Sequence, residues 1–341
     1  MKLDMWRWPF DKVEFKWADV KILEVRNMVI RESFYTHISG SDGLPLSVLR
    51  IEPDNSSNIK GIVQLVHGMA EHKERYIDFM KFLAQKGYVT VIHDNRGHGD
   101  SVKTKDDLGF LYTGGYKAFI EDIHEITLET KKYVRDELGI EAYPYILMGH
   151  SMGSLAVRCY IRKYDNEINY LGVLGCPSEK KIAVIGLKFI QLLEKILGSR
   201  KRSKLVDYIV TGDYSRKFKD EGIKNAWMCS DPEVVRRYEE DPLCGFIFTI
   251  NGYIDLIKLH LLTYSDEKIE TKNPNLKIKF FSGGEDPCGI SKAAIRKAMR
   301  FIRKQGYKKI SGKIYPGMRH EVINEIGKEK VYADILKFIQ S

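Results

Sequence analysis

The chain has 341 residues with an apolar fraction of 43%, enough for the core of one large α/β domain or two ordinary domains. Charged residues make up 30%, and no apolar run approaches the roughly 20 residues that cross a bilayer, which argues against a membrane-spanning protein. The net charge of +9 is compatible with nucleic acid, anionic lipid or acidic substrates, but no nucleic-acid-binding motif accompanies it.

The amino-terminal segment reads MKLDMWRWPF and lacks the apolar stretch and small-residue cleavage site of an exported precursor. We therefore expect an uncleaved start and a cytoplasmic protein. Residues 1–30 are predicted to form an N-terminal extension.

The first predicted elements are a strand pair, Phe34–Gly40 and Leu44–Glu52, joined by a turn at residues 41–43. From Ile59 onward, short apolar runs typical of strands alternate with segments of helical periodicity. This alternation predicts a parallel sheet covered by helices on both faces. The predicted strands are Ile59–Val66, Tyr88–His93, Tyr145–Met148 and Tyr170–Leu174, and the predicted helices are Arg75–Gln85, Tyr116–Leu138 and Met152–Lys163.

The alternation stops between about Pro177 and Asn275, where the sequence predicts helices and no clear strand. It then resumes to the end of the chain, with strands at Lys277–Ser282 and Lys308–Tyr315 and helices at Ser291–Lys304 and Lys328–Ile339. We therefore expect an α/β core formed by residues 31–176 and 276–341, interrupted by a helical cap at 177–275.

A GxSxG motif spans Gly149 to Gly153 and has Ser151 at its centre. It follows a predicted strand and opens a predicted helix, where a sharp turn lifts the serine above the sheet edge and flanking glycines permit the strained geometry. A serine hydroxyl attacks a carbonyl at neutral pH only if an imidazole takes its proton. Ser151 is therefore the predicted nucleophile, and a partner histidine is required.

Of nine histidines, His320 is placed best for that role, because it follows the last predicted strand, where a loop can reach back over the nucleophile. The acid that orients it should follow the penultimate strand, and the turn Phe281–Pro287 offers Asp286 there. Its neighbour Glu285 is a competitor, since either carboxylate could accept the imidazole N–H. The chain order serine, aspartate, histidine is that of the α/β-hydrolase fold, which we predict with an inserted helical cap.

A tetrahedral intermediate also needs backbone donors for its oxyanion. The amide after the nucleophile, that of Met152, is the first candidate. The second should lie in the loop after an earlier strand, and His67, Gly68 and Met69 follow the strand that ends at Val66. The backbone N–H of Met69 is the candidate there.

Three further motifs resemble the monoacylglycerol lipase and lysophospholipase family. Residues 67–72 read HGMAEH, followed by Arg75 and Tyr76; residues 94–101 read DNRGHGDS; and residues 241–246, in the predicted cap, read DPLCGF. The similarity runs from roughly Phe34 to the end of the chain.

Carried over by position, this resemblance implies the triad Ser151, Asp286 and His320 with oxyanion donors Met69 and Met152. It also implies an acyl-enzyme mechanism without a metal or another cofactor, and a small-molecule acyl-glycerol or lysophospholipid substrate. For a long acyl chain, the apolar helix Ile182–Leu197 could line a tunnel or form the packed interior of the cap.

We expect no metal site. His67, His72 and His93 end different elements without HxH or HExxH spacing. The five cysteines are odd in number and lack CxxC spacing, so we expect reduced and mostly buried thiols rather than disulfides or zinc ligands. They are Cys159, Cys176, Cys229, Cys244 and Cys288.

The densest basic stretch contains Arg200, Lys201, Arg202 and Lys204 and follows an apolar segment. Such a stretch could touch anionic lipid headgroups at a membrane surface, or it could be an ordinary solvated loop.

Two other functions stay open. A proline iminopeptidase-like peptidase would keep the triad but needs a carboxylate for the substrate's ammonium group, and Glu179, Glu239 and Glu240 lie in no recognisable motif for it. A non-catalytic binding protein on the same fold is the other, since fold alone does not establish activity. The filled triad positions argue against that second reading.

Overall fold

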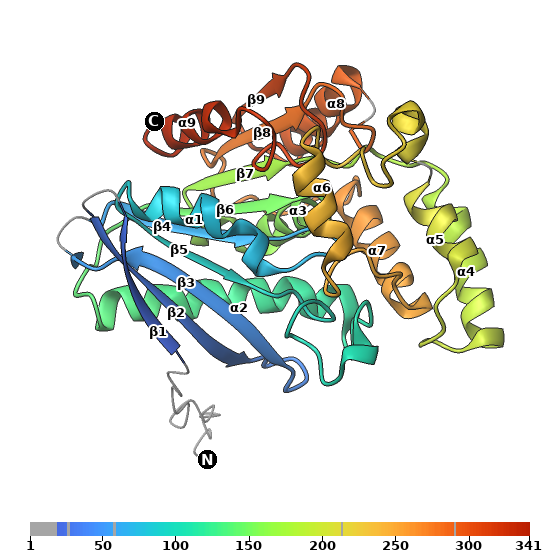
Figure 1. Cartoon of the computed structure of the whole chain (residues 1–341), viewed down its shortest axis with the longest axis horizontal. Helices are drawn as coiled ribbons and strands as arrows, with labels where there is room; N and C mark the ends of the chain where they lie inside the picture. Colours follow the sequence, from blue (N-terminus) through green and yellow to red (C-terminus); the bar gives the residue numbers. More distant parts are fainter. Residues whose placement is uncertain (1–18, 26–27, 57–58, 213, 290) are drawn as a thin grey trace, which may run out of the picture.

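The computed structural model describes residues 19–25, 28–56, 59–212, 214–289 and 291–341. Its strands are β1 (Asp19–Val25), β2 (Met28–Ile38), β3 (Pro45–Pro53), β4 (Gly61–Val66), β5 (Tyr88–His93), β6 (Tyr145–His150), β7 (Tyr170–Leu174), β8 (Lys277–Gly283) and β9 (Lys309–Tyr315). They form one nine-stranded sheet in the order β1-β2-β3-β5-β4-β6-β7-β8-β9 (Figure 1). The pairs β1–β2, β2–β3 and β3–β5 are antiparallel, and the five remaining pairs are parallel.

Helices cover both faces of this sheet. The helices are α1 (Ile77–Ala84), α2 (Gly115–Asp136), α3 (Met152–Tyr164), α4 (Ala183–Leu197), α5 (Lys204–Thr211), α6 (Pro232–Glu240), α7 (Ile250–Thr263), α8 (Lys292–Lys304) and α9 (Lys328–Ile339), with short 3₁₀ helices at Lys73–Tyr76, Lys105–Asp107, Asp165–Glu167 and Tyr214–Glu221. One apolar cluster joins α1 and α9 to the sheet, and a larger one joins α2, α3 and α8 to the opposite face.

The inner strand β6 contributes side chains to both apolar clusters. Tyr145 and Leu147 belong to the cluster with α2 and α3, whereas Ile146 and Met148 belong to the cluster with α1 and α9. Successive side chains of a strand point to opposite faces, so a strand covered on both sides must be continuously apolar. The sheet therefore fixes the carboxyl end of β6, which leads directly into the GxSxG turn.

The predicted fold class is confirmed. The bounds of β5, β7 and α9 match the prediction, and β6 runs two residues further, to His150. The structure adds one strand that the sequence did not suggest. This strand, β1, lies within the predicted N-terminal extension and pairs with β2.

Helices α4 to α7 are inserted between β7 and β8, as the predicted cap requires (Figure 1). Their division from the core at residues 177 and 275 stays a prediction. The last of them, α7, packs against α2 and α3 of the core, and a Cβ on its Gly252 would lie 2.1 Å from the Gly109 carbonyl oxygen. The insertion is thus anchored to the core through α7.

Helix α4 meets the expectation of a packed interior on one side, where Leu187, Ile190 and Leu193 pack into the larger core cluster, and departs from both expectations on the other. Ile190 is the one fully buried residue of this helix, while Ile185, Phe189, Leu192 and Ile196 are exposed. These exposed side chains therefore neither line a tunnel nor form a packed interior. None of the helices in the described part of the chain has the length and apolar character needed to cross a bilayer.

Candidate active site

Ser151 lies in a strained turn between β6 and α3. Its φ of 50° and ψ of −115° are unusual for a residue with a side chain, and its amide donates to the Leu174 carbonyl at 3.0 Å. A Cβ on Gly153 would lie 2.2 Å from the Val66 carbonyl oxygen, and a Cβ on Gly149 would lie 2.3 Å from the Gly153 oxygen. Gly153 therefore lets α3 approach β4 closely, and Gly149 lets the end of β6 approach the first turn of α3.

His320 and Asp286 form a buried pair. His320 Nδ1 lies 3.0 Å from Asp286 Oδ1, and the Cys288 amide donates to the same oxygen at 2.8 Å. Both side chains are almost fully buried. The described contacts of Glu285 are different: its amide donates to the Met318 carbonyl, and its own carbonyl accepts from Lys217. Asp286, rather than Glu285, is the carboxylate at the His320 ring.

The charges of this pair support each other. Burial alone lowers the pKa of His320, but the charge and hydrogen bond of Asp286 outweigh it and hold that pKa above its ordinary value. Burial raises the pKa of Asp286, and His320 together with the Cys288 amide brings it below its ordinary value. The pair thus favours the protonated imidazole, which forms when a base accepts a proton.

The structure brings the serine and the histidine into one site without a direct bond between them. The ring of His150, next to Ser151, lies 4.7 Å from the ring of His320. Within the described residues, no hydrogen bond joins the Ser151 hydroxyl to His320. Because Nδ1 of His320 is used by Asp286, Nε2 is the nitrogen left to accept a proton. Catalytic hydrogen bonds are often long before substrate binds, so this geometry is compatible with a base.

The loop after β4 lies beside Ser151. A Cβ on Gly68 would be 3.2 Å from the Ser151 Cβ, so only glycine leaves ordinary contact there. The Gly68 amide donates to Glu71, whereas the amides of Met69 and Met152 donate to no described residue. The two candidate oxyanion donors are therefore free.

Glu71 links the separate parts of the site and was not predicted as a functional residue. Its Oε1 accepts from the Gly68 amide at 2.5 Å, the Tyr76 hydroxyl at 3.0 Å and His150 Nδ1 at 3.1 Å. Its Oε2 accepts from Arg75 at 2.5 Å. Although burial raises the pKa of Glu71, Arg75 and His150 hold it well below its ordinary value. The carboxylate is therefore charged.

Arg75 connects this network to the loop after β9, which carries His320. Its guanidinium donates to both carboxylate oxygens of Glu321, at 2.9 and 2.6 Å, and Glu321 is the neighbour of His320. Such two-pronged pairs fix orientation as well as distance. The motif containing Glu71 and Arg75 was visible in the sequence, but its partner lies 246 residues away.

The cap covers the histidine. The ring of Trp227 lies 5.1 Å from that of His320 and 5.0 Å from that of Tyr214. The Glu321 amide also donates to the Met228 carbonyl at 2.8 Å. No sequence signal pointed to Trp227, which contributes an apolar wall beside the candidate base.

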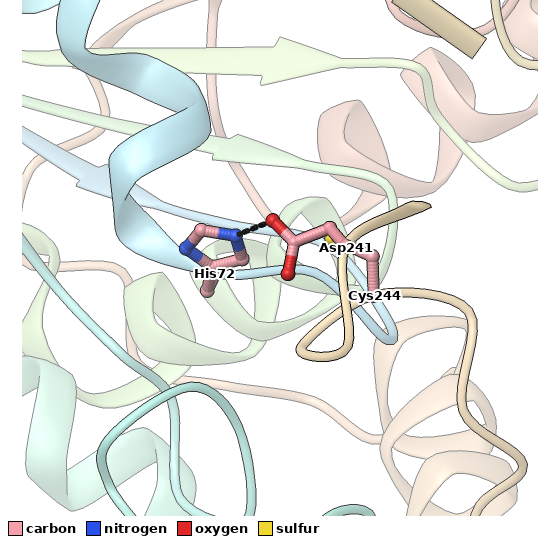
Figure 2. Close-up of side chains that lie close together, drawn as sticks. All are labelled: His72, Asp241 and Cys244. Atoms are coloured by element: carbon pink, nitrogen blue, oxygen red, sulfur yellow. Dashed lines mark hydrogen bonds and ion pairs between the residues drawn. The ribbon is translucent and has the colours of Figure 1, made fainter. Parts of the chain in front are cut away.

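A second contact joins core and cap at His72, Asp241 and Cys244, whose ligand-type atoms lie within 4.8 Å of one another (Figure 2). Such a mixed set of donors could hold a zinc ion. However, His72 Nε2 lies 2.8 Å from Asp241 Oδ2, and Nδ1 is hydrogen-bonded to Glu74. Burial lowers the pKa of His72, but Cys244 and the two carboxylates raise it to about 11. A protonated imidazole has no free lone pair, so this cluster acts as an ion pair.

A similar donor set in the candidate triad consists of Asp286, Cys288 and His320. Its histidine Nδ1 is hydrogen-bonded to Asp286, as a triad requires, and burial raises the pKa of the Cys288 thiol well above its ordinary value. The thiol is therefore neutral and unsuited to bind a metal or to act as a nucleophile.

Comparison with known proteins shows the family of the chain and its fold. A family model described as serine aminopeptidase, S33, matches residues 57–327. A monoacylglycerol lipase of Mycolicibacterium smegmatis is 25% identical over 287 residues, which are 83% of this chain and 89% of the relative.

Solved structures show the same fold. The thermostable carboxyl esterase of Bacillus coagulans, in complex with glycerol, superposes with a TM-score of 0.78 at 24% identity, covering 91% of this chain and 98% of the esterase. A soluble variant of the Saccharomyces cerevisiae monoglyceride lipase, with a substrate analogue, gives a TM-score of 0.63 at 18% identity and covers 98% of both chains.

Asp286→Asn is expected to shift the pH dependence of activity. In the wild type, a neutral His320 is needed and its pKa is raised, so kcat/KM should fall as pH drops through a midpoint above 6.5. Without the carboxylate charge, burial dominates and the midpoint should move to lower pH, with a rate loss of up to about 10⁴-fold. The pH profile of p-nitrophenyl ester hydrolysis measures both.

Glu285→Gln is the matched control and should leave the rate and the midpoint unchanged. If Glu285→Gln abolished activity while Asp286→Asn kept the wild-type profile, the assignment of the acid would be wrong.

Glu71→Gln is expected to lower kcat about tenfold or more. The NH₂ group of glutamine would face hydrogen-bond donors that the Glu71 carboxylate accepts from, and the resulting repulsion should displace the loop that carries Met69. KM should change much less, since the position of the loop matters most in the transition state. Steady-state kinetics would be compared with those of Glu74→Gln, a nearby carboxylate that contacts His72 and Lys73 instead. Equal kcat values for the two folded variants would contradict the positioning role.

His72→Gln is expected to destabilise the protein more at low than at high pH. Because the folded-state pKa of His72 is raised to about 11, the ion pairs stabilise fully below pH 6.5 and lose their effect as pH rises towards 11. The loss in Tm at pH 6 should be about 4 °C, measured by thermal denaturation, and should shrink at pH 10. A loss that grows with pH would show that His72 is neutral in the folded protein.

Proposed function

The chain belongs to the serine aminopeptidase S33 family, and we propose that it is a serine-dependent carboxylic ester hydrolase that acts on monoacylglycerols or lysophospholipids. That it is a hydrolase with the α/β-hydrolase fold follows from the family and its relatives. One observation carries the finer proposal. A buried, hydrogen-bonded His320–Asp286 pair lies at the same sheet edge as the strained turn of Ser151.

In the proposed reaction, His320 Nε2 takes the proton of the Ser151 hydroxyl while the oxygen attacks the ester carbonyl. The amides of Met69 and Met152 donate to the resulting oxyanion. The tetrahedral intermediate collapses to an acyl-enzyme, and the protonated His320 passes its proton to the departing alcohol. Water, activated by the same imidazole, then releases the fatty acid and restores the Ser151 hydroxyl.

The ester substrate class rests on the motifs shared with monoacylglycerol lipases and on relatives that bear that name. The described carboxylates weighed for a peptide's ammonium group all have partners in the fold. Glu179 pairs with Lys297, Glu239 accepts from Asn225, and Glu240 pairs with Arg236. Because these carboxylates already have partners, ester hydrolysis is favoured over the aminopeptidase activity that the family description names.

A substrate panel tests the proposal. It contains p-nitrophenyl esters of short to long acyl chains, 1-monoacylglycerol, lysophosphatidylcholine and an amino-acid anilide. The wild type is expected to cleave the glycerol or phospholipid esters, while Ser151→Ala and His320→Ala each lose about 10⁴-fold or more in kcat with the fold retained.

Circular dichroism of each variant provides the folding control. Cleavage of the anilide without ester preference would assign the protein to the peptidase branch. Turnover of the esters that survives in Ser151→Ala would reject the nucleophile.

A further inference from the structure

Helix α4 presents an apolar stripe to solvent. Its members recur at spacings of three and four residues, which places them on one face of the helix. Their exposed fractions run from 43% for Phe189 to 71% for Ile182. The stripe consists of Ile182, which is the N-cap residue of α4, and of Ile185, Phe189, Leu192 and Ile196 within the helix.

Helix α5 continues this surface. Leu205, Tyr208 and Ile209 are also exposed there, and α5 contacts α4. Both helices lie at the outer edge of the molecule, on the far side of α7 from α3 (Figure 1). We call the exposed apolar residues of these two helices the α4–α5 face. Several large exposed apolar side chains gathered on neighbouring helices are typical of an interaction site.

Basic side chains border the α4–α5 face. Lys181 precedes α4, and Lys188 and Lys195 follow it within the helix at intervals of seven residues. Lys201 lies in the turn between the helices, and Lys204 is the first residue of α5. All five lysines are exposed, and none forms an ion pair with a described residue.

Acidic groups are scarce on the same segment. Between residues 181 and 210 there are two, Glu194 and Asp207, both half-buried, and Asp207 accepts a hydrogen bond from the Tyr253 hydroxyl. The polar border of the α4–α5 face is therefore positively charged.

The two arginines of the basic stretch have a different role. Arg200 pairs with Asp107 and lies 4.1 Å above the Phe110 ring, while Arg202 donates to the Asp106 carbonyl at 2.8 Å. They fasten the turn between α4 and α5 to the core. The helices are thus held with the apolar stripe facing outward, and the lysines are the cations left for a partner.

We propose that the α4–α5 face binds the surface of a membrane containing anionic phospholipids. An apolar stripe bordered by lysines on a short helix is the pattern of helices that lie in the membrane interface, with apolar side chains among the acyl chains and lysines at the phosphates. A second copy of this chain fits less well, because pairing the two faces would bring their lysine rows together. The proposal concerns this surface and does not depend on the reaction at Ser151.

Cosedimentation of the full-length protein with vesicles tests the proposal. One set contains phosphatidylcholine alone, and the other contains about 30% phosphatidylglycerol. Binding to the anionic vesicles is expected to be at least about tenfold stronger and to weaken when NaCl is raised from roughly 0.1 to 0.5 M.

The double variant Ile185→Ser/Leu192→Ser should lose about tenfold or more in affinity for anionic vesicles. Lys188→Gln and Lys195→Gln should each lose about fivefold. Leu128→Ser and Lys132→Gln, which change exposed residues of α2, are the matched controls and should bind as the wild type does. Each variant should hydrolyse a short, water-soluble ester at the wild-type rate, which separates loss of binding from damage to the fold.

Three results would overturn the proposal: no binding of the wild type to anionic vesicles, equal binding by the wild type and the α4 double variant, or a dimer in lipid-free sedimentation that the double variant loses. The last would assign the face to a second copy of the chain.

Discussion

The charged carboxylate of Glu71 is the constraint on which the site depends. A buried charge is costly unless its surroundings supply enough donors, and Glu71 has four: the Gly68 amide, the Tyr76 hydroxyl, the His150 ring and the Arg75 guanidinium. These donors come from the loop after β4, the 3₁₀ turn that follows it and the end of β6. Satisfying one charge therefore fixes three segments relative to each other.

That constraint holds two strained backbone positions in place. Ser151 and Ala70 both have positive φ, of 50° and 52°, although neither is glycine. Such conformations cost on the order of 1–3 kcal/mol each and persist only where neighbouring contacts determine them. The network around Glu71 supplies those contacts from the core, and the cap adds one, since the Gly245 amide donates to the Ala70 carbonyl at 2.9 Å. The loop motif HGMAEH and the cap motif DPLCGF thus meet near Ser151.

The sequence predicted what depends on local patterns and strand order. The turn at Ser151 is set by glycines two residues to either side, and Asp286 and His320 each follow a strand that the sequence pattern predicts. The bonds between Arg75 and Glu321 and the tilted contact between the Trp227 and His320 rings could not be predicted, because they join distant segments through side-chain packing. The exposure of α4 was missed for a related reason, since helical periodicity does not say which face another element covers.

The role of Ser151 is tested by the residue to which a fluorophosphonate attaches, located by peptide mass spectrometry of the folded protein. We expect one adduct per chain, on Ser151. Excess monoacylglycerol should prevent its formation by competition, and His320→Ala should largely prevent it as well. Labelling of another residue, or no labelling of folded wild-type protein, would contradict the role of Ser151.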